Sequence, residues 1–373
     1  MFTRDLYYSN KRRKFRRIVL GVEAVALASL SLFCFGLSKL TRIRHESIGP
    51  IETNAADISP TVAEKLKGYT NIALFGLDNR TTGRYDSGQS DVIMICSINN
   101  DTKEIRLASV YRDTLMDVDG EGKLRKCNYA YNHGGPEAAL TMLNRNLDLS
   151  LQDFVAVDFK ALAEAIDAVG GIDLTITEDE ISPGKINHYI DEVAALTKRK
   201  GGHVEAGTQH VNGVQATAYC RLRYTASMDF GRAARQRIVL QRLFEAAKKA
   251  GPVKLNALID SVIDDISTSL STPEVLRLAL AVTDYSIKDT TGYPFQKNLA
   301  NPSRTIGSVV VPCDVESNVK ELHRFLFDET GHEPSATVSA IAADVTDLTG
   351  FTAADAIDFD PAYEDASGTE VSK

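Results

Sequence analysis

The sequence predicts a layered α/β domain, built on a largely parallel or mixed sheet and preceded by one membrane-spanning helix. Short apolar runs alternate with segments of helical period along the middle of the chain, as they do in layered α/β folds. One apolar run near the N-terminus is long enough to cross a bilayer as a helix. The 373 residues provide enough chain for one large domain with a substantial core, or for two ordinary domains.

The N-terminus combines a basic segment, residues 1–17, with a run that we interpret as a transmembrane helix over residues 18–40. Glu23 is the one charged residue in its apolar part, Ile18 to Ser38. The excess of Lys and Arg before the run places the N-terminus in the cytoplasm and the rest of a single-pass membrane protein outside. A cleaved signal peptide is the competing interpretation, because Ala26 to Ser29 resembles a cleavage site. The apolar run continues to Leu37, which favours a retained anchor.

The composition argues against a nucleic-acid-binding protein. Trp is absent and the formal net charge is -8, whereas nucleic-acid binders normally present a basic face. Four cysteines follow the apolar run, in what would be an oxidising compartment: Cys96, Cys127, Cys220 and Cys313. They form no CxxC pair, so we expect no zinc or redox site.

The remaining pattern predicts a stalk, a folded domain and a tail. Residues 41–68 are polar with two prolines and little periodicity, which indicates a stalk. Strands are predicted over residues 71–77, 92–98, 105–110, 154–157, 172–176 and 306–311, and helices over 136–147, 159–169, 229–249, 254–266, 273–282 and 317–327. Asp229 is expected to cap its helix. Residues 339–373 are predicted to be a disordered acidic tail.

Two carboxylates at strand ends are the first candidate site. Asp78 and Asp91 each lie at the edge of a predicted strand, and strand ends face the rim of an α/β sheet, where such folds place ligands. Two carboxylates at a rim can hold Mg²⁺, which usually shares its shell with substrate phosphates. Acidic residues after strands are more often turn formers, so this pair alone leaves both interpretations open.

Arginines provide the second and third candidates. Arg112 follows a strand and could clamp a phosphate, or form a surface ion pair with Asp113. A denser group occupies one short stretch: Arg221, Arg223, Arg232, Arg235, Gln236 and Arg237. The first two would share one face if their segment is extended, and Arg232 and Gln236 would share one helical face near the positive helix end.

A solvated basic face is the ordinary explanation of clustered arginine. Here the surrounding chain is acidic, which favours a polyanion site, and arginine suits bidentate phosphate recognition. The sequence contains no visible Ser/His/Asp arrangement and no metal-ligand spacing of histidines. The chemistry that these residues indicate is therefore phosphoryl transfer by positioning and charge neutralisation.

Taken together, these segments resemble the LytR-CpsA-Psr family over about residues 70–250, with weaker similarity to Val338. The matching pieces are NIALFGLDNR, QSDVIMICSIN, IRLASVYRDT, KLRKCNYAYNHGGPEAAL, DFVAVDFKALAEAIDAVGGIDL, GTQHVNGVQATAYCRLRYT and DFGRAARQR. The resemblance implies a three-layer α/β/α sandwich with a mixed central sheet, over a catalytic domain of residues 69–338. It also implies a hydrophobic pocket for a prenyl chain and an arginine-lined mouth for a pyrophosphate.

The function that the resemblance implies is extracytoplasmic phosphotransfer. Such an enzyme moves a glycopolymer (teichoic acid, capsule or a related polysaccharide) from an undecaprenyl pyrophosphate carrier to peptidoglycan through a phosphodiester bond. Its partners are the lipid-linked glycopolymer, peptidoglycan and the lipid bilayer, without nucleic acid. Two alternatives stay open: a polyprenyl pyrophosphate phosphatase, and a non-catalytic envelope sensor or transcriptional regulator.

The resemblance also implies roles for individual residues. Asp78 and Asp91 would bind Mg²⁺ or Mn²⁺ and act in catalysis with Arg112 and Arg232. The pyrophosphate contacts would be Arg80, Arg112, Lys126, Arg221, Arg223, Arg232 and Gln236. A disulfide between Cys127 and Cys220 is expected to join the two phosphate-binding stretches; two small buried thiols are the alternative.

One departure from the family pattern concerns the residue before Ser90. This chain has Gln89-Ser90-Asp91 where family members commonly have Arg-Ser-Asp, so one positive charge is absent. Either Arg84 replaces that charge or the affinity for phosphate is lower.

Overall fold

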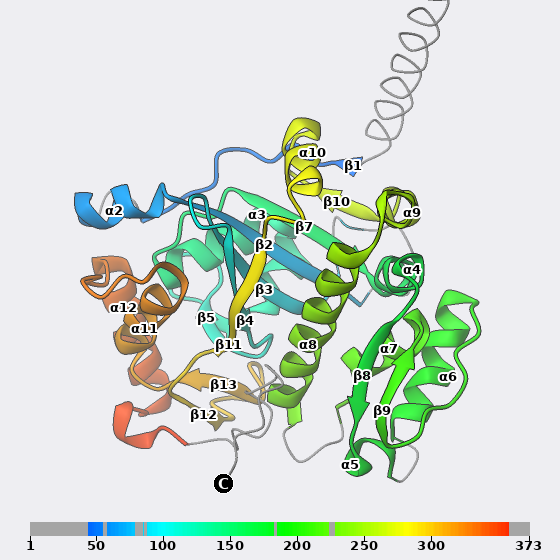
Figure 1. Ribbon diagram of the computed structural model, residues 1–373. Coiled ribbons are helices and arrows are strands. Elements are labelled where there is room, and N and C mark those ends of the chain that lie inside the picture. Colours follow the sequence, from blue (N-terminus) through cyan, green and yellow to red (C-terminus); the bar gives the residue numbers. More distant parts are fainter. Residues whose placement is uncertain are drawn as a thin grey trace, which may run out of the picture. The chain divides into compact units, whose positions relative to one another are not determined.

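The structure is a computed structural model that describes residues 44–54, 58–78, 85, 88–182, 185–223 and 228–357 (Figure 1). The predicted basic segment 1–17 and the predicted transmembrane helix 18–40 lie outside the described residues. Within them, no helix combines the length and the apolar character that a membrane crossing requires.

A mixed seven-stranded sheet forms the middle of the domain, in the order β1-β10-β7-β2-β3-β4-β11. Its strands are β1 (Arg44–His45), β10 (Ile266–Thr268), β7 (Asp153–Asp158), β2 (Tyr69–Leu77), β3 (Ser90–Asn99), β4 (Glu104–Val110) and β11 (Ser286–Tyr293). The pairs β1/β10, β2/β7 and β4/β11 are parallel, and the other three neighbouring pairs are antiparallel. The predicted α/β fold with a mixed central sheet is confirmed.

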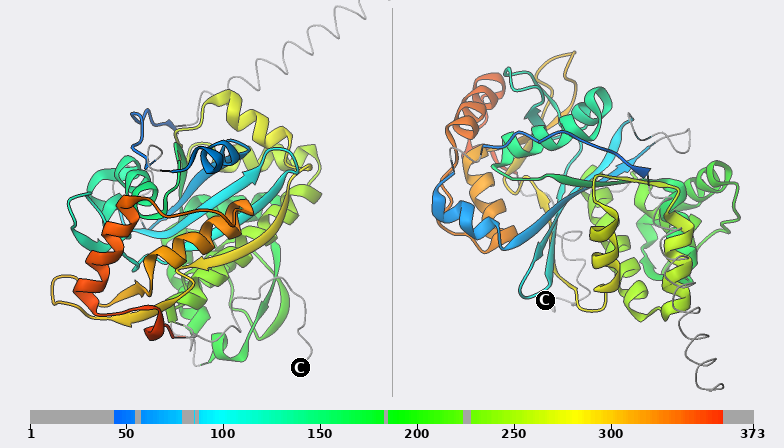
Figure 2. Two further views of the ribbon diagram at one scale, coloured as in Figure 1. Left: turned by 90° about the vertical axis from the view of Figure 1, so that its left-hand side faces the viewer. Right: turned by 90° about the horizontal axis from the view of Figure 1, so that it is seen from above.

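Helices cover both faces of this sheet (Figures 1 and 2). One face packs against α2 (Pro60–Leu66), α3 (Asn128–Leu147), α11 (Val315–Phe327) and α12 (Ala336–Thr349). The other faces α8 (Met228–Lys249) and α10 (Thr272–Leu280). Side chains alternate along β2 accordingly: Phe75 packs on the Tyr131 ring of α3, with centroids 4.9 Å apart, while Leu74 points to the α8 side.

A second, smaller core lies beside the sheet. It joins α4 (Phe159–Val169), α5 (Glu178–Ile181), α6 (Lys185–Thr197), α7 (Gly213–Arg221) and the antiparallel pair β8 (Ile172–Ile176) and β9 (Gly207–Val211). The α9 helix (Pro252–Val262) packs on α4. Two further strand pairs complete the described elements: β5 (Leu115–Asp117) with β6 (Leu124–Lys126), and β12 (Lys297–Ala300) with β13 (Val309–Pro312).

The bounds of α4 follow from local chemistry. The Asp158 side chain accepts a hydrogen bond from the Ala161 amide at 2.9 Å, which caps the helix. Gly170 ends it with a φ of 101°, a left-handed conformation that a residue without Cβ adopts readily. The predictions for residues 159–169 and 172–176 are therefore confirmed.

Two predictions about the ends of the domain are wrong in the described residues. The expected stalk, residues 41–68, contains β1 and α2, and its Ile51, Ile58 and Val62 are buried in the main core. The expected tail begins too early, because α12 continues to Thr349 and buries Ile341 and Val345. Isolated apolar side chains in polar or Ala-rich surroundings gave little periodic signal, although each one reaches the core.

The predicted helix over residues 254–266 is also too long. α9 ends at Val262, and Ile266 opens strand β10, which pairs with β7 at the opposite side of the sheet from β11. A short apolar run fits a helix or a strand equally well, so the sequence pattern did not separate the two.

Candidate active site

The candidate site lies at one end of the sheet, where β2 stops and β3 starts. Leu77 pairs with Ser90, and the Asp78 amide donates to the Gln89 carbonyl at 3.1 Å. Asp78 and Asp91 therefore start from neighbouring strands at the same edge, as the strand-end argument predicts. The Asp91 side chain is buried, whereas Asp78 is half-buried.

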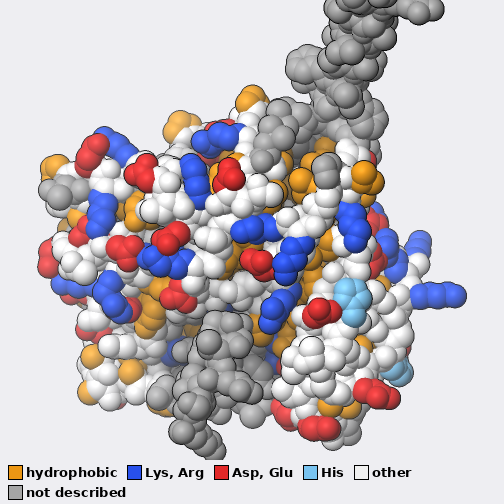
Figure 3. Space-filling model, viewed as in Figure 1, with side chains coloured by type: hydrophobic (Ala, Val, Ile, Leu, Met, Phe, Trp, Pro, Cys, Tyr) orange, Lys and Arg blue, Asp and Glu red, His pale blue; other side chains and the backbone are white. Residues whose placement is uncertain are grey.

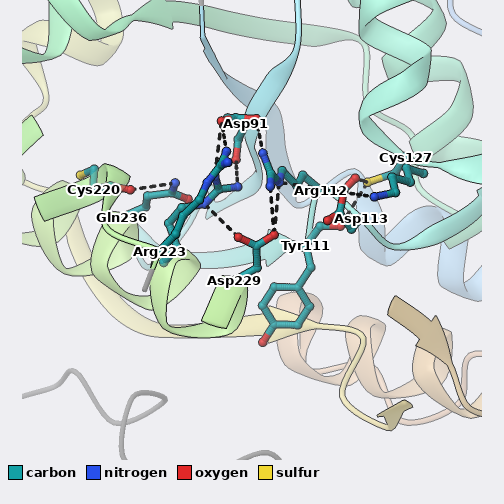
Figure 4. A network of polar contacts seen from close by, with 11 residues as sticks. Asp91, Tyr111, Arg112, Asp113, Cys127, Cys220, Arg223, Asp229 and Gln236 are labelled. Atoms are coloured by element: carbon teal, nitrogen blue, oxygen red, sulfur yellow. Dashed lines mark hydrogen bonds and ion pairs between the residues drawn. The ribbon is translucent and has the colours of Figure 1, made fainter. Parts of the chain in front are cut away.

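Three guanidinium groups converge on the Asp91 carboxylate (Figure 4). Arg112, which follows β4, donates to one carboxylate oxygen at 2.7 Å. Arg223 and Arg232 donate to the other oxygen at 3.1 Å and 3.3 Å, from the segment after α7 and from α8 respectively. These arginines are up to 141 residues from Asp91 in the sequence, so the fold alone brings them together.

The charges of this cluster favour each other's ionised forms, and burial opposes them. Burial acts to raise the pKa of Asp91, but the guanidinium groups of Arg232, Arg112 and Arg223 outweigh burial and hold this pKa below its usual range. Burial acts to lower the pKa of Arg112, yet Asp91, Asp229 and Asp113 raise it overall. The pKa of Arg232 is lowered, because its burial outweighs the attraction of Asp229 and Asp91.

Two further carboxylates extend the cluster, and the sequence argument gave neither a functional role. Asp229 lies in the first turn of α8, 3.2 Å from Arg112 Nη2 and 3.6 Å from Arg232 Nε. It was expected as a helix cap; its position three residues before Arg232 was the signal that both face one side of the helix. Asp113 lies between Arg112, at 3.9 Å, and Lys126, at 3.2 Å.

Lys126 and Gln236 lie at the edges of this group. Lys126 is connected to it through Asp113. Gln236 lines the same small pocket as Asp91 and Arg232, and its Nε2 donates to the Cys220 carbonyl at 3.3 Å. The structure thus brings together most of the residues that the resemblance singled out.

Arg221 is the exception. Arg221 and Arg223 would share a face if their segment were extended, but Arg221 is the last residue of the helix α7, which Asn212 and Gln215 cap reciprocally. Its guanidinium lies 4.8 Å from the Phe159 ring centroid and 3.5 Å from Glu192. The described contacts of Arg221 therefore do not include Asp91, and the extended segment on which a face shared with Arg223 depended is not present.

Two other arginines of the dense stretch are buried. Arg235 and Glu180, both fully buried, form an ion pair at 3.3 Å, and Arg235 also donates to the Leu222 carbonyl at 2.6 Å. Arg237 is 1% exposed. The prediction treated the whole stretch as one basic cluster, but Arg235 is paired with Glu180 of α5 and not with Asp91. Arg80 and Arg84 lie outside the described residues.

A divalent cation would meet oxygen donors here, but in small number. Among the described residues, no group of three or more His, Cys, Asp or Glu side chains is placed to hold a metal ion. Asp78 and Asp91 are two carboxylates at one edge, and both Asp91 oxygens already accept hydrogen bonds from arginine. These residues fit an ion that takes the rest of its shell from substrate phosphates and water.

The predicted disulfide between Cys127 and Cys220 is wrong in the described chain, where both are free buried thiols. Cys127 donates to the carbonyls of Tyr111 and Arg112, each at 3.2 Å. Cys220 lies at the opposite end of the polar network (Figure 4). The alternative of two small buried thiols therefore holds, because α7 and α3 approach the site from different sides.

The cavity next to the arginines is small. It is lined by Ile93, Val110, Tyr111 and Ala233 as well as by the charged residues, and its volume of about 10 Å³ is that of one water molecule. Among the described residues, the cavity that the arginines line is too small for a prenyl chain. Half-buried apolar side chains do lie between the sheet and α8: Leu74, Cys96, Val155, Leu240 and Phe244. Figure 3 shows hydrophobic side chains at the surface beside α8, among Lys and Arg.

The chain is similar to curated bacterial cell-wall proteins. It is 29% identical over 218 residues to the polyisoprenyl-teichoic acid–peptidoglycan teichoic acid transferase TagU of Enterococcus faecalis, a match that covers 56% of this chain and 64% of that protein. It is 25% identical to the transferase TagV of Bacillus subtilis, over 74% of this chain and 69% of that one. Biofilm regulatory protein A of Streptococcus mutans is 30% identical, over 68% and 59%.

Solved structures share the fold. The protein gbs0355 of Streptococcus agalactiae superposes with a TM-score of 0.59 at 23% identity, covering 75% of this chain and 94% of that one. B. subtilis TagV superposes with a TM-score of 0.55 at 24% identity, covering 70% and 98%. The model of the LytR_cpsA_psr family matches residues 38–306. With the sheet, the converging arginines and this match in view, the chain belongs to the LytR-CpsA-Psr family.

Proposed function

We propose that this protein is a membrane-anchored extracytoplasmic phosphotransferase. It moves a glycopolymer from a polyprenyl diphosphate carrier to peptidoglycan and leaves a phosphodiester bond. One observation carries the proposal: three arginines from distant segments meet a buried carboxylate at the end of the sheet. Its relatives TagU and TagV are named as teichoic acid transferases that act between a polyisoprenyl carrier and peptidoglycan, which supports the same reaction class.

The arginines suit a diphosphate because each guanidinium can offer two parallel N–H groups to phosphate oxygens. A hydroxyl of the acceptor glycan attacks the phosphorus that carries the glycopolymer, and a new P–O bond forms. The bond from that phosphorus to the bridging oxygen breaks, and polyprenyl phosphate leaves. The positive charges stabilise the charge that spreads over the phosphoryl oxygens during this exchange.

The hydroxyl proton needs an acceptor. Asp229 is the more accessible of the two carboxylates that contact Arg112 and Arg232, with a side chain 28% exposed against 7% for Asp91. We assign the proton to Asp229, because the low pKa of Asp91 makes that carboxylate a weak base.

Asp78 and Asp91 would hold Mg²⁺ or Mn²⁺, which would neutralise diphosphate oxygens when bound. The prenyl chain would lie on the half-buried apolar residues between the sheet and α8, which include Leu240 and Phe244. Because the cavity beside the arginines is small, this placement requires α8 to move away from the sheet when the lipid binds.

The decisive experiment uses the purified full-length chain in detergent, a lipid-linked glycan and peptidoglycan oligomers. A phosphodiester-linked product supports the transferase. Free phosphorylated glycan would instead indicate the phosphatase, and binding without turnover would indicate the sensor.

Protease protection in membrane vesicles would test the topology with the catalytic domain outside.

Arg112→Ala sharpens this experiment. Its guanidinium contacts Asp91 and Asp229, and Asp91 keeps Arg223 and Arg232 as partners, so the fold is expected to survive. We expect kcat to fall by about 100-fold or more. Arg324→Ala is the control, because that exposed arginine of α11 pairs with Glu321 far from the cluster. Equal activity of the two variants would contradict the proposal.

A further inference from the structure

A basic trough opens beside the arginine cluster. It is a hollow of about 460 Å³, a size that holds small ligands. Six side chains define the basic trough: Gln89, Lys123, Arg125, Lys126, Tyr129 and His133. Its lining includes Lys126 and Asn128, the chain neighbours of Cys127, and Figure 4 shows Cys127 at the opposite end of the polar network from Gln236 and Cys220.

The charge of the basic trough has one sign. Its described lining contains three cationic side chains, Lys123, Arg125 and Lys126, and no Asp or Glu. Within the described residues, Lys126 is paired with Asp113 at 3.2 Å, whereas Lys123 meets Asp119 only at 3.8 Å and Arg125 donates to the Leu124 carbonyl without an ion pair. In a chain with a net charge of -8, such a surface attracts anions selectively.

Aromatic and amide groups give the trough a second kind of contact. Tyr129 and His133 stack with centroids 3.5 Å apart and planes 14° from parallel. The side-chain amides of Gln89 and Asn132 are exposed at the trough. Flat rings and exposed amides are groups that bind the apolar faces and hydroxyls of sugars.

The basic trough is connected to the proposed reaction centre. Lys126 contacts Asp113 at 3.2 Å, and Asp113 contacts Arg112, which binds Asp91. Beyond the Tyr129 and His133 rings, a second hollow of about 630 Å³ continues along α3 past Glu137 to Arg145. Because Glu52, Asp119 and Glu137 also line this second hollow, the acidic groups of a glycan would lie in the trough, and a neutral part of its sugar chain would continue past the stacked rings.

We infer that the basic trough binds an acidic glycan and positions it for the reaction at Asp91 and Arg112. The inference rests on the proposed function, for which it names the surface that holds the sugar chain. Two sources carry the required phosphate or carboxylate groups: the glycopolymer of the donor and the peptidoglycan acceptor. The prenyl chain of the donor would lie on the apolar residues near α8, outside the trough.

The test is a charge-removing pair, Lys123→Ala/Arg125→Ala, in the full-length chain. Binding is measured directly for a poly(glycerol phosphate) oligomer, a peptidoglycan oligomer and the neutral glycan chitotetraose. We expect about tenfold weaker binding of at least one acidic glycan, with the loss disappearing at high salt. Weakening of the phosphate polymer alone identifies the donor, and weakening of the peptidoglycan oligomer alone identifies the acceptor.

The matched control is Lys198→Ala/Lys200→Ala, which removes the same charge from exposed residues after α6. His133→Ala tests the stacked rings and should weaken chitotetraose binding about threefold at any salt concentration. Wild-type affinity of the Lys123/Arg125 variant for both acidic glycans would overturn the inference. If these affinities fall but the wild type transfers no glycopolymer, the inference about the trough stands and the proposed function fails. If the wild type transfers glycopolymer but these affinities do not fall, the proposed function stands and the inference fails.

Discussion

Both carboxylate oxygens of Asp91 accept hydrogen bonds from arginine in the absence of substrate. A cation or a diphosphate that enters the site would therefore have to replace some of the contacts between Asp91 and the arginines, because these charges are already paired with one another. Such preorganisation is favourable for catalysis, because the positive groups need no reorganisation as charge develops. It also means that Asp78, which is less buried, is the carboxylate more readily available to a metal ion.

A first prediction at the residue scale concerns that metal. Asp78→Asn should raise the Mg²⁺ concentration for half-maximal transfer by about tenfold or more, because one charged oxygen ligand is lost while the arginine cluster stays intact. Metal titrations of the transfer rate measure this shift. Asp101→Asn, at an exposed turn between β3 and β4, is the control; equal Mg²⁺ dependence in both variants would remove Asp78 from the metal site.

A second prediction at this scale concerns the cysteines. Cys127 and Cys220 are separate buried thiols, and burial raises the pKa of Cys220 to about 12. A reductant should leave the melting temperature unchanged, and alkylating reagents should modify both thiols only after unfolding. Mass spectrometry of non-reduced peptides provides the measurement. A linked Cys127–Cys220 peptide would show that the two segments move together in the oxidised protein.

At the scale of elements, α12 is held by a buried polar network at the end of α3. Asp148 accepts hydrogen bonds from Ser335 Oγ at 2.6 Å and from Asn54 at 2.7 Å, and His332 lies 3.2 Å from it. The network connects the segment before α2, the end of α3 and the start of α12. Such contacts explain why residues on both sides of the predicted domain belong to its core.

His323 makes this network sensitive to acid. Its ring stacks on His332 with centroids 3.6 Å apart, and burial, with the neighbouring His332, lowers the pKa of His323 to about 4 from an ordinary 6.5. Above pH 6.5 neither the folded nor the unfolded state is protonated. As the pH falls toward 4, His323 becomes protonated in the unfolded chain but stays mostly neutral in the folded chain. The free energy of unfolding therefore decreases.

The prediction is a loss of roughly 3 kcal/mol between pH 6.5 and 4 from this residue. His323→Gln keeps a donor for the Leu147 carbonyl, which His323 contacts at 3.0 Å, and should remove this part of the pH dependence. Urea unfolding at several pH values measures the effect. His188→Gln, at a side chain 72% exposed, should leave the wild-type dependence; an unchanged slope in the His323 variant would refute the assignment.

At the scale of the whole molecule, α8 joins the two cores. Its Arg232 faces the reaction centre, while Arg235 is buried against Glu180 of α5. Adjacent turns of one helix therefore contribute to the proposed substrate site and to the docking of the smaller core. This division explains how a stretch dense in arginine can belong to an acidic chain without forming one solvated basic surface.

Arg235→Met should lower the free energy of unfolding by about 3–5 kcal/mol, because the buried Glu180 carboxylate loses its cationic partner. Adding Glu180→Gln should restore part of the loss, since the amide oxygen can still accept from the Thr177 amide, as Glu180 does at 2.8 Å. Arg199→Met, at a partly exposed pair with Asp167, should cost less than about 1 kcal/mol. Equal losses for both arginines would contradict the structural role.

The sequence by itself determined several of the elements and indicated a type of chemistry. Alternating and helical periods located β2, β4, α4 and β8 within a residue or two, because a half-buried strand or helix needs a regular apolar pattern. The strand-end carboxylates and clustered arginines indicated phosphate chemistry, because few other groups match a diphosphate. These signals lie within short segments, so they can be read from a single sequence.

Only the tertiary structure decided which charged residues share a site. Arg223 and Arg232 reach Asp91, whereas Arg221 turns to Phe159 and Arg235 to Glu180, although all four lie within fifteen residues. Asp229 and Asp113 joined the cluster, and Cys127 stayed apart from Cys220. The direction of a side chain depends on where its residue falls around the helix and on how distant segments pack. Neither can be read from the composition of a short stretch.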